Sequence, residues 1–451
     1  MIPIFKKGNP TSVNNYRPIS ILSSINKIFE KILYGRLSNY IDHFQILYKY
    51  QFGFRKNHST EHALIEFVDQ VRFSMDKKEL TCGIFIDLSK AFDTVNHNIL
   101  IKKLEHYGIR GIALDLFKSY LCNRKQFVQI DSCKSEIRSI DCGVPQGSVL
   151  GPLLFLLFIN DLPNCSLSGK FRIFADDTTV FFQCKNADEL IATGKTIMIE
   201  LNAWFRANKM TLNAEKSSFT IFKSNRLNIP NLPDQIEFLD KKIDKSSSIR
   251  FLGLTLDESL SWDQHINELS NKLKSLFHIF YNIRDFLRES DIKTLYYTLV
   301  YSRIKYGISL YGQAAQTKIQ KIQVLQNQLL KVLSNKKRRY STEKLHREFD
   351  ILMVQDIKNH EILTFVHNYF YNNLPPVFDD YFIRFNHCYN TRNVNNSYQI
   401  KSHNTDTAAL SVQIDGSKQW NKLNNELKLI PKRKNFRKKI KKSLVDSYSS
   451  D

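Results

Sequence analysis

The sequence predicts an α+β fold over about the first 260 residues, followed by a helical C-terminal region. Short apolar strands in the first part end in acidic residues, at Asp87 and at Asp176-Asp177. From Trp262 onward, apolar residues recur every three or four positions, as in helices. With 42% hydrophobic and 12% aromatic residues in 451, the chain has enough apolar content for a large core, which excludes a disordered protein.

The net charge indicates the kind of partner. Lys and Arg number 65 against 44 Asp and Glu, giving +21, which favours a polyanion, with an anionic membrane surface as the competitor. The most apolar stretch, 149–159, is about half the ~20 residues of a spanning helix. The seven cysteines form no C-x-x-C pair, as is typical of reducing compartments. We therefore expect an intracellular protein, in the nucleus or cytoplasm, with no membrane contact.

Helical periodicity opens the first part. It predicts helices over 21–37 and 63–71, and an apolar run predicts a buried strand over 82–89 that is interrupted by Asp87. A helix over 96–107 is closed by Gly108. The next predicted elements are a two-strand region over 127–130 and 136–142, and a long apolar helix that extends through Phe158.

Strand-forming residues flank Ala-Asp-Asp in the segment 171–183, which predicts a hairpin with acids at its tip. A helix over 190–205 follows, and then strands over 219–222 and 249–256. The polar insert between these two strands contains two prolines and is expected to be an exposed loop.

The chain is helical to about residue 335, where a basic run, 336–339, marks a boundary. The remainder has a weaker helical pattern. Near its end, the basic stretch 432–442 is interleaved with apolar residues at Ile430, Phe436, Ile440 and Leu444, which predicts an amphipathic basic helix. Two interpretations of its charged face remain: it binds nucleic acid, or it is simply solvated.

Asp87, Asp176 and Asp177 are the candidate chemical groups. A buried carboxylate is costly unless it is paired or binds a cation, and Mg²⁺ prefers carboxylate oxygens and substrate phosphates. Two such ions stabilise the attacking and leaving oxygens of an in-line phosphoryl displacement, which requires carboxylates from separate strands. An Asp-Asp pair taken alone is more often a solvated turn, so the sequence context decides.

That context is an ordered set of motifs between residue 1 and about 260: NYRPIS (15–20), QFGFRKNHST (51–60), FIDLSKAFDTVNH (85–97), GVPQGSVLGPLLF (143–155), FADDTTVF (174–181), LNAEKS (212–217) and RFLGLTLD (250–257). The set resembles the reverse transcriptase of non-LTR retrotransposons of the jockey-like kind. The resemblance implies a right-hand polymerase: fingers and palm with an antiparallel sheet over 1–248, primer grip and helical thumb over 249–335, and a C-terminal basic accessory region over 336–451.

The resemblance also implies roles for single residues. Asp87, Asp176 and Asp177 match the family's metal-binding carboxylates, and the carbonyl of Leu88 completes the site for two Mg²⁺ ions, with Mn²⁺ as a possible substitute. Lys216 matches the lysine that protonates the departing pyrophosphate, a general-acid role.

Further matches concern the nucleotide and the primer. Phe92 matches the aromatic residue that blocks a ribose 2′-OH, and Gln146 and Gly147 match a loop that contacts the incoming nucleotide and the template. Arg55 and Arg17 resemble fingers residues that hold the triphosphate, a task suited to guanidinium groups. The matched primer grip, a hydrophobic hairpin that holds the growing 3′ end, includes Phe251, Leu252, Gly253 and Leu254. Asp93 and Asn96 lie in a matched stretch and are expected to be structural.

The implied function is RNA-directed DNA polymerisation, with an RNA template, a DNA primer, their RNA–DNA hybrid and deoxynucleoside triphosphates as partners; the sequence leaves protein partners unknown. No segment corresponds to the endonuclease that such elements usually carry upstream, so we expect the polymerase part of a longer reading frame. A catalytically silent nucleic-acid-binding remnant is the alternative. A polymerase of the group II intron type fits FADD and LSKAFDTVNH less well.

One competing motif is present. His58-Ser-Thr-Glu61-His62 matches the H-x-x-E-H pattern of a zinc peptidase helix. It lies inside the QFGFRKNHST motif and has no evident third ligand, so we expect no zinc site there.

Overall fold

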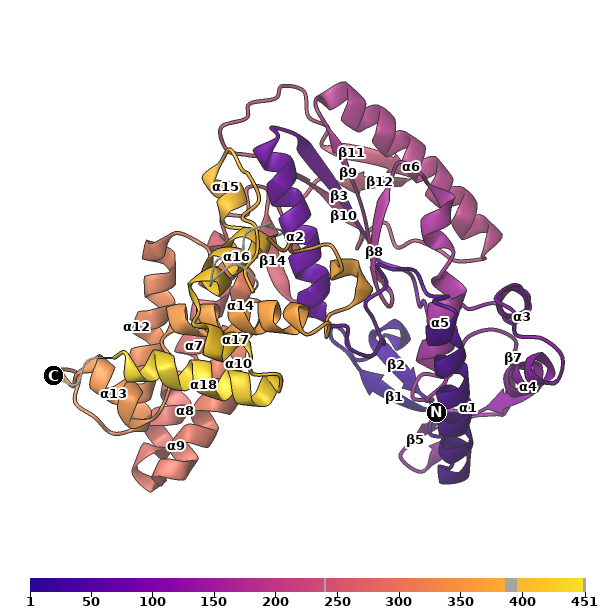
Figure 1. The fold of residues 1–451 in the computed structure, drawn as a ribbon. Helices are drawn as coiled ribbons and strands as arrows, with labels where there is room; N and C mark the ends of the chain where they lie inside the picture. The colour runs from indigo at the N-terminus through magenta and orange to yellow at the C-terminus, as the bar shows by residue number, and fades with distance from the viewer. Residues whose placement is uncertain (239–240, 386–395, 449–451) are drawn as a thin grey trace.

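The computed structural model describes residues 1–238, 241–385 and 396–448. A four-stranded antiparallel sheet, ordered β10-β3-β9-β8, is its centre. The strands are β3 (Leu80–Ile86), β8 (Lys170–Phe174), β9 (Asp177–Cys184) and β10 (Ser218–Phe222). Figure 1 shows helices α2 (Thr60–Asp76) and α6 (Ala187–Ala207) beside this sheet. The predicted α+β class is confirmed.

Side chains alternate between the two faces of the sheet, and both faces are buried. On one face, the ring of Phe67 from α2 packs against Phe85, Phe181 and Phe222, with ring centroids 6.0, 5.2 and 5.7 Å away. On the other face, residues such as Ile84 form a second core together with α6. Two buried faces explain why β3 is a continuous apolar run in the sequence.

The N-terminal elements form one end of the molecule, at the right of Figure 1. The helices are α1 (Ser24–His43), α3 (His97–His106), α4 (Ile112–Leu121) and α5 (Gly151–Ile159), with short turns η1 (Val13–Asn15) and η2 (Leu162–Cys165). The strands are β1 (Ile2–Phe5), β2 (Tyr16–Ile19), β4 (Arg124–Gln126), β5 (Gln129–Ile130), β6 (Cys133–Lys134) and β7 (Arg138–Ile140). Asn96 caps α3 by accepting a hydrogen bond from the Ile99 N–H, 3.1 Å, which is a structural role.

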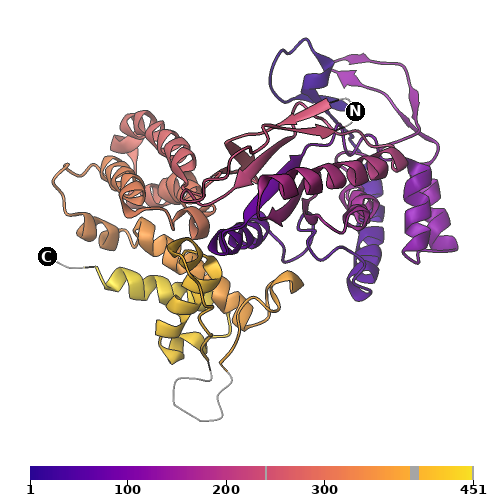
Figure 2. The ribbon, with the colours of Figure 1, turned by 90° about the horizontal axis from the view of Figure 1, so that it is seen from above.

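The C-terminal helices form the other end, and Figure 2 shows α2 between the two ends. Those up to residue 333 are α7 (Asp263–Lys274), α8 (Leu276–Ile283), η3 (Arg284–Phe286), α9 (Glu289–Leu295), the π-helix η4 (Tyr296–Tyr301), α10 (Ser302–Lys305), α11 (Ile308–Tyr311) and α12 (Gln316–Leu333). The later ones are α13 (Thr342–Glu348), α14 (Val354–Phe370), η5 (Pro376–Phe378), α15 (Asp406–Ala409), α16 (Val412–Lys422), α17 (Asn425–Lys428) and α18 (Arg433–Asp446).

Two predictions for the segment between β10 and α7 are wrong. The insert expected to be a loop contains the strand pair β11 (Gln235–Phe238) and β12 (Lys241–Asp244). The single strand that the apolar pattern predicts over 249–256 is instead a hairpin of β13 (Ser248–Phe251) and β14 (Leu254–Asp257), as the resemblance to a primer grip implies. The chain reverses at Leu252 and Gly253, both with positive φ (44° and 87°), a conformation that glycine adopts without steric cost.

A single core connects the sheet to the C-terminal helices. It contains Phe67 and Phe85 from the sheet region, Leu254 from β14, Leu329 from α12 and Phe436 from α18. Helices on both sides of residue 335 therefore share one apolar interior rather than forming separate cores.

A buried polar contact anchors α16 to α2. The Asp69 carboxylate accepts hydrogen bonds from the backbone N–H groups of Val412 and Gln413, both 3.1 Å, and from the Tyr381 hydroxyl. Arg72 donates to the carbonyl of Leu410. Asp69 and Arg72 are buried at 1% and 2% exposure, so neither charge could be tolerated without these partners.

Within the residues described, no helix has the length and apolarity needed to cross a membrane. The six cysteines in the described ranges are free thiols, and Cys388 lies outside those ranges.

Candidate active site

The register of the sheet brings the three candidate acids to one edge. Ile86, the last residue of β3, pairs with Thr178 of β9, so the next position, Asp87, lies opposite Asp177. Asp177 in turn pairs with Phe174 across the β8–β9 hairpin, and Asp176 occupies the two-residue turn between them. The predicted hairpin with acids at its tip is confirmed, and the register places these acids beside the end of β3.

The acids repel one another. Burial, followed by the charges of Asp176 and Asp87, raises the pKa of Asp177 from the ordinary 3.8 to about 6. The pKa of Asp176 is also raised, by burial first and then by Asp87, while Arg17 and Lys6 oppose the rise. These carboxylates thus form a concentration of negative charge with little local compensation.

The described residues include no group of three or more His, Cys, Asp or Glu side chains positioned to hold a metal ion. The donor set at the sheet edge nevertheless fits a hard divalent cation: it is all carboxylate, it is solvent accessible at Asp176 and Asp177, and its mutual repulsion is what a bound cation relieves.

The segment 211–217 fixes the main chain at Asp87. The Asp87 N–H donates to the Ser217 hydroxyl (3.1 Å), and its carbonyl accepts from the Asn213 N–H (2.9 Å). The Ser89 N–H donates to the Thr211 carbonyl, 3.0 Å, around an antiparallel bridge between Leu88 and Leu212. In such a bridge the N–H and C=O of the central residue point away from the partner segment. The Leu88 carbonyl is thus not used by this bridge.

Lys216 lies on the exposed turn that precedes Ser217. Its backbone N–H donates to the carbonyl of Asn213, 3.2 Å, so the main chain of Lys216 is fixed close to the residue that holds Asp87. Its side chain is solvent exposed.

Gln51 holds the turn of the acidic hairpin, a role the sequence analysis did not assign. Its Oε1 accepts from the N–H of Ala175 (3.3 Å) and from that of Gly53 (3.0 Å), and its side chain is 1% exposed. Ala175 has a positive φ of 58°. A Cβ at Gly53 would lie 2.4 Å from the Ala175 nitrogen, so only glycine permits this approach. The sequence feature that could have indicated this role is the pattern Gln-x-Gly just before Phe54.

The ring of Phe92 is held in place by two other aromatic rings. Its ring stacks on Phe155 of α5 at 4.4 Å between centroids and 27° between planes, and contacts the edge of Phe54 at 6.4 Å. Its carbonyl accepts from the Val144 N–H, 2.8 Å. The ring is half-buried, so one part remains available to a ligand.

The loop with Gln146 and Gly147 is tied to its surroundings on both sides. The Gln146 side chain donates to Asp93, 2.8 Å, and its carbonyl accepts from the Ser20 N–H, 2.7 Å. Gly147 has a φ of 102°, and a Cβ there would lie 2.9 Å from the Ser20 carbonyl oxygen. Glu30, 1% exposed, accepts from the Val149 N–H, 2.6 Å. Asp93 therefore orients the side chain of Gln146.

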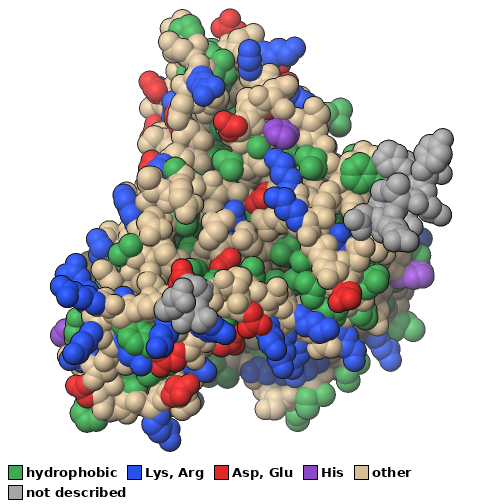
Figure 3. Space-filling model, turned by 60° about the vertical axis from the view of Figure 1, so that its left-hand side comes forward, with side chains coloured by type: hydrophobic (Ala, Val, Ile, Leu, Met, Phe, Trp, Pro, Cys, Tyr) green, Lys and Arg blue, Asp and Glu red, His purple; other side chains and the backbone are tan. Residues whose placement is uncertain are grey.

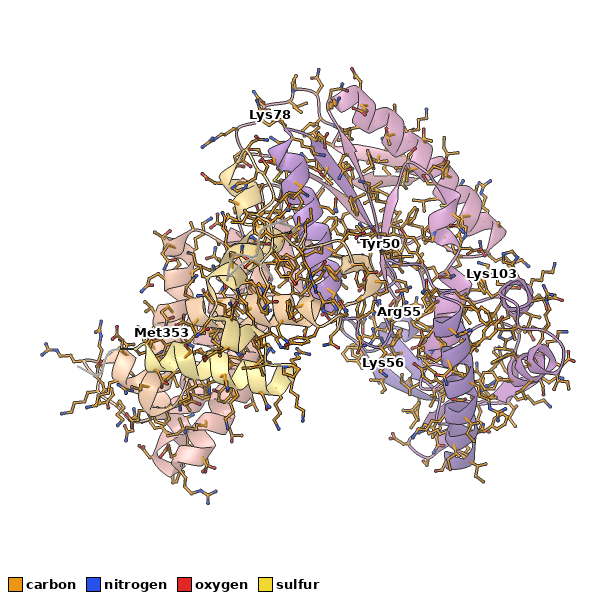
Figure 4. The ribbon with its side chains drawn as sticks, in the orientation of Figure 1. Tyr50, Arg55, Lys56, Lys78, Lys103 and Met353 are labelled. Carbon is orange, nitrogen blue, oxygen red and sulfur yellow. The ribbon has the colours of Figure 1, made fainter. Side chains whose placement is uncertain are left out.

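The two candidate arginines differ. The Nη1 of Arg55 donates to the carbonyls of Tyr48 and Gln51, both 3.1 Å, so part of its guanidinium stabilises its own loop. Figure 4 shows Arg55 and Lys56 in the middle of the molecule, between the N-terminal elements and the C-terminal helices. Arg17 is exposed on β2 and acts on Asp176 together with Lys6. Lys6 is a second residue that the sequence analysis missed; its only signal was the Lys-Lys pair before Gly8.

The candidate primer grip is only partly accessible. Phe251 and Leu254 are buried at 4% and 0% exposure, while Leu252 is half-buried and Gly253 exposed at the tip of the hairpin. The Tyr306 hydroxyl donates to the Leu252 carbonyl. A Cβ at Gly253 would lie 3.0 Å from the Tyr306 ring, so the tip is fixed against the start of α11.

The His58–His62 pair has no metal-site geometry in the described residues. The ring of His62 packs against Phe365 and Phe378 at 6.2 and 5.7 Å. Burial, then the charges of His58 and Arg433, lowers its pKa to about 4. His62 is therefore a partly buried, neutral residue packed between aromatic rings.

Comparison with known proteins now decides the family. Residues 4–256 match the model of the reverse transcriptase (RNA-dependent DNA polymerase) family, more than half of the chain. The chain belongs to the reverse transcriptase family. All three acids at the sheet edge lie within the matched range, and family membership confirms the predicted right-hand polymerase class.

Individual relatives extend the match beyond residue 256. The chain is 31% identical over 361 residues to the probable RNA-directed DNA polymerase from transposon X-element of Drosophila melanogaster, covering 78% of this chain and 39% of that protein. It is 29% identical over 367 residues to the RNA-directed DNA polymerase from mobile element jockey of the same species, covering 79% and 40%. The resemblance to the jockey-like non-LTR kind is confirmed, and the chain spans about two fifths of the length of these relatives.

Among solved structures, the apo telomerase of Candida tropicalis matches with 12% identity and a TM-score of 0.38, covering 73% of this chain and 55% of the telomerase chain.

Proposed function

We propose that this chain catalyses RNA-directed DNA synthesis, adding deoxynucleotides to a primer 3′-OH. The observation that carries the proposal is the meeting of Asp87, Asp176 and Asp177 at one sheet edge, where the charge of Asp87 contributes to the raised pKa of both Asp176 and Asp177, in a chain of the reverse transcriptase family. A polymerase requires such an uncompensated cluster, because the charge of its metal ions and of the substrate phosphates completes it.

The three aspartates and the Leu88 carbonyl are the groups that would hold Mg²⁺. When bound, the ions supply Lewis acidity that favours deprotonation of the primer hydroxyl and stabilises charge on the phosphates. The chain's own residues do the rest. Arg17 and Lys6, whose charges already reach Asp176, attract the triphosphate. The Lys216 ammonium, on the turn beside the residue that holds Asp87, donates a proton to the leaving pyrophosphate.

Selection of the sugar falls to Phe92. Its ring cannot withdraw, because Phe155 stacks behind it and Phe54 covers its edge. A ribose 2′-OH placed against it meets an apolar surface and loses its hydrogen bonds to water, which is unfavourable. The loop of Gln146 and Gly147, fixed to Ser20 and Asp93, provides a backbone surface for the template and the base.

Primer extension tests the proposal. A DNA primer on an RNA template is extended with deoxynucleotides in Mg²⁺ or Mn²⁺ by the unmodified chain and by Asp176→Asn. We expect extension by the former and a loss of about 10³-fold or more in the latter, equivalent to several kcal/mol of transition-state stabilisation. Asp188→Asn, an exposed acid in the first turn of α6, is the matched control and should extend normally.

The second arm tests the sugar gate. Phe92→Ala should incorporate ribonucleotides at least about tenfold more readily relative to deoxynucleotides, and Phe92→Tyr should retain discrimination because its ring still occupies the space. Binding of the primer–template without any extension by the unmodified chain would contradict the proposed function and identify a silent nucleic-acid-binding remnant.

A further inference from the structure

Helix α18 carries a dense array of positive charge that the proposed active site does not use. Residues 432–442 include eight Lys and Arg residues and no acidic residue. Two of these cations have anchoring ion pairs: Arg437 with Glu361, 2.7 Å, and Lys441 with Asp350. Both anchors tie α18 to the neighbouring helical core rather than neutralising its outer face.

The other six cations form a surface, here named the α18 basic face: Lys432, Arg433, Lys434, Lys438, Lys439 and Lys442. All six are exposed, and within the described part of the chain none of them forms an ion pair. Figure 3 shows Lys and Arg side chains gathered along the lower part of the molecule in that view.

The stability of the helix does not explain this face. The first turn of α18 contains no acidic residue and has no side-chain cap, so Arg433 and Lys434 oppose the helix dipole. Cations at Lys434, Lys438 and Lys442 recur at four-residue intervals, a like-charge spacing that destabilises a helix. The helix is held by its buried face instead, through Phe436, Ile440 and other core residues.

The buried face also decides between two kinds of anionic partner. A helix that lies in a membrane surface inserts its apolar side between the lipids. In α18 that side is occupied: Phe436, Ile440 and Val445 are 0%, 2% and 4% exposed, and Phe436 stacks on His367 at 4.1 Å. Only the charged side is free, which suits a polyanion in water.

The position of α18 connects this face to the polymerase part. Figure 1 shows the N-terminal end of α18 directed toward the middle of the molecule, away from the chain's C-terminus. Arg433 at that end is close enough to depress the pKa of His62, near the start of α2. His62 follows the loop of Arg55 and Lys56, and the Lys56 side chain is exposed.

We propose that the α18 basic face binds the phosphate backbone of the primer–template outside the active site. The row from Lys434 to Lys442 is about 12 Å long at 1.5 Å per residue, which spans about three phosphates of one strand at 3.4 Å along the duplex axis. The inference rests on the proposed function for the identity of the ligand, and recognition is by charge, without reading of the base sequence.

The test is the salt dependence of binding to a labelled RNA–DNA primer–template without nucleotides. In the triple variant Lys434→Gln, Lys438→Gln, Lys442→Gln, we expect the slope of log affinity against log salt to become less negative by about 2, at 0.7–0.9 per lost phosphate contact. The matched control removes three exposed lysines on and beside α6: Lys185→Gln, Lys195→Gln, Lys209→Gln. Its slope should equal that of the unmodified chain. Equal melting temperatures of the three proteins exclude misfolding.

An unchanged slope in the α18 variant would overturn the inference. The inference would also be overturned if the α18 variant bound the RNA–DNA hybrid normally but no longer bound phosphatidylserine vesicles. That result would assign the α18 basic face to a membrane. Primer extension measured in parallel separates the two proposals. If the α18 substitutions change the salt slope but the unmodified chain does not extend primers, the result supports the α18 basic face and contradicts the proposed polymerase function.

Discussion

Two sets of carboxylates in this molecule differ in burial and in partners. Asp69, between α2 and α16, is surrounded by donors: two backbone N–H groups, the Tyr381 hydroxyl and the charge of Arg72, all of which oppose the rise in its pKa that burial causes. Asp177, at the sheet edge, has no neighbouring group that lowers its pKa. Burial and the charges of Asp176 and Asp87 all raise it.

This difference in partners distinguishes a carboxylate that stabilises the fold from one that is available to a ligand. A carboxylate kept for stability is saturated with hydrogen bonds, because an unpaired buried charge costs several kcal/mol. A carboxylate kept for a ligand is left unsaturated, so that the ligand supplies the missing positive charge. The contrast predicts that variants of the two sets will affect stability with opposite signs.

The largest expected effect on stability is at Asp69. Asp69→Ala leaves the buried Arg72 charge without its partner and three donors without an acceptor, so the free energy of unfolding should fall by about 3–5 kcal/mol. Urea unfolding measures it. The matched control is Asp76→Ala on the same helix, whose partially exposed carboxylate accepts from Asn404 and Thr405 and should cost only about 1 kcal/mol. Equal losses at both positions would contradict the role of burial.

Gln51→Leu should have an intermediate effect. It removes the acceptor for the Ala175 and Gly53 N–H groups in a buried site, which costs about 1–3 kcal/mol. Because Ala175 adjoins Asp176, extension should fall and half-saturation by Mg²⁺ should move to higher concentration. Gln51→Glu keeps an acceptor oxygen. Compared with Gln51→Leu, it should recover the Mg²⁺ concentration at half-saturation more fully than the free energy of unfolding. A variant with lost stability but an unchanged Mg²⁺ requirement would show that Gln51 does not position the acid.

A smaller effect of opposite sign is expected at Asp176. Asp176→Asn removes one of the repelling charges, so the metal-free protein should gain up to about 1 kcal/mol while losing extension. Thermal unfolding with a chelator present measures the gain. The same substitution at the exposed Asp188 should not stabilise. A loss of stability in Asp176→Asn would mean that the acidic edge is structural, like Asp69.

The smallest effect is the pH dependence of the metal-free chain. A carboxyl with a raised pKa contributes stability that is complete below its unfolded-state pKa near 4 and is lost as the pH rises through the folded-state value, about 6 for Asp177. Between pH 4 and 7 the unmodified chain should therefore lose more stability than Asp177→Asn. Mg²⁺ should raise the melting temperature more at pH 7.5 than at pH 5, because binding requires ionised carboxylates.

Local pattern was sufficient to predict much of the fold and of the acidic edge. The apolar run before Asp87, the hairpin around Ala-Asp-Asp and the closure of α3 at Gly108 each depend on neighbouring residues, and each is found where expected. The same holds for α18 and its buried residues.

Contacts between distant segments could not be predicted in this way. Nothing near Asp69 in the sequence indicates that it caps α16, more than 300 residues later. Gln51 binds Ala175, which lies 124 residues later in the sequence. The apolar pattern alone missed the hairpin over 248–257, which the resemblance implied, because its turn residue Leu252 is not a turn former; contact between its carbonyl and Tyr306 stabilises the reversal.

The contact between α2 and the segment 410–413 has a consequence for synthesis of the chain. Asp69 and Arg72 on α2 take their buried partners from Val412, Gln413 and Leu410, which the ribosome adds more than 300 residues later. At 5–20 residues per second, the 343 residues from Asp69 to Val412 take roughly 20–70 s. For that time the two charges lack these hydrogen bonds, so this side of α2 reaches its final packing only near the end of synthesis.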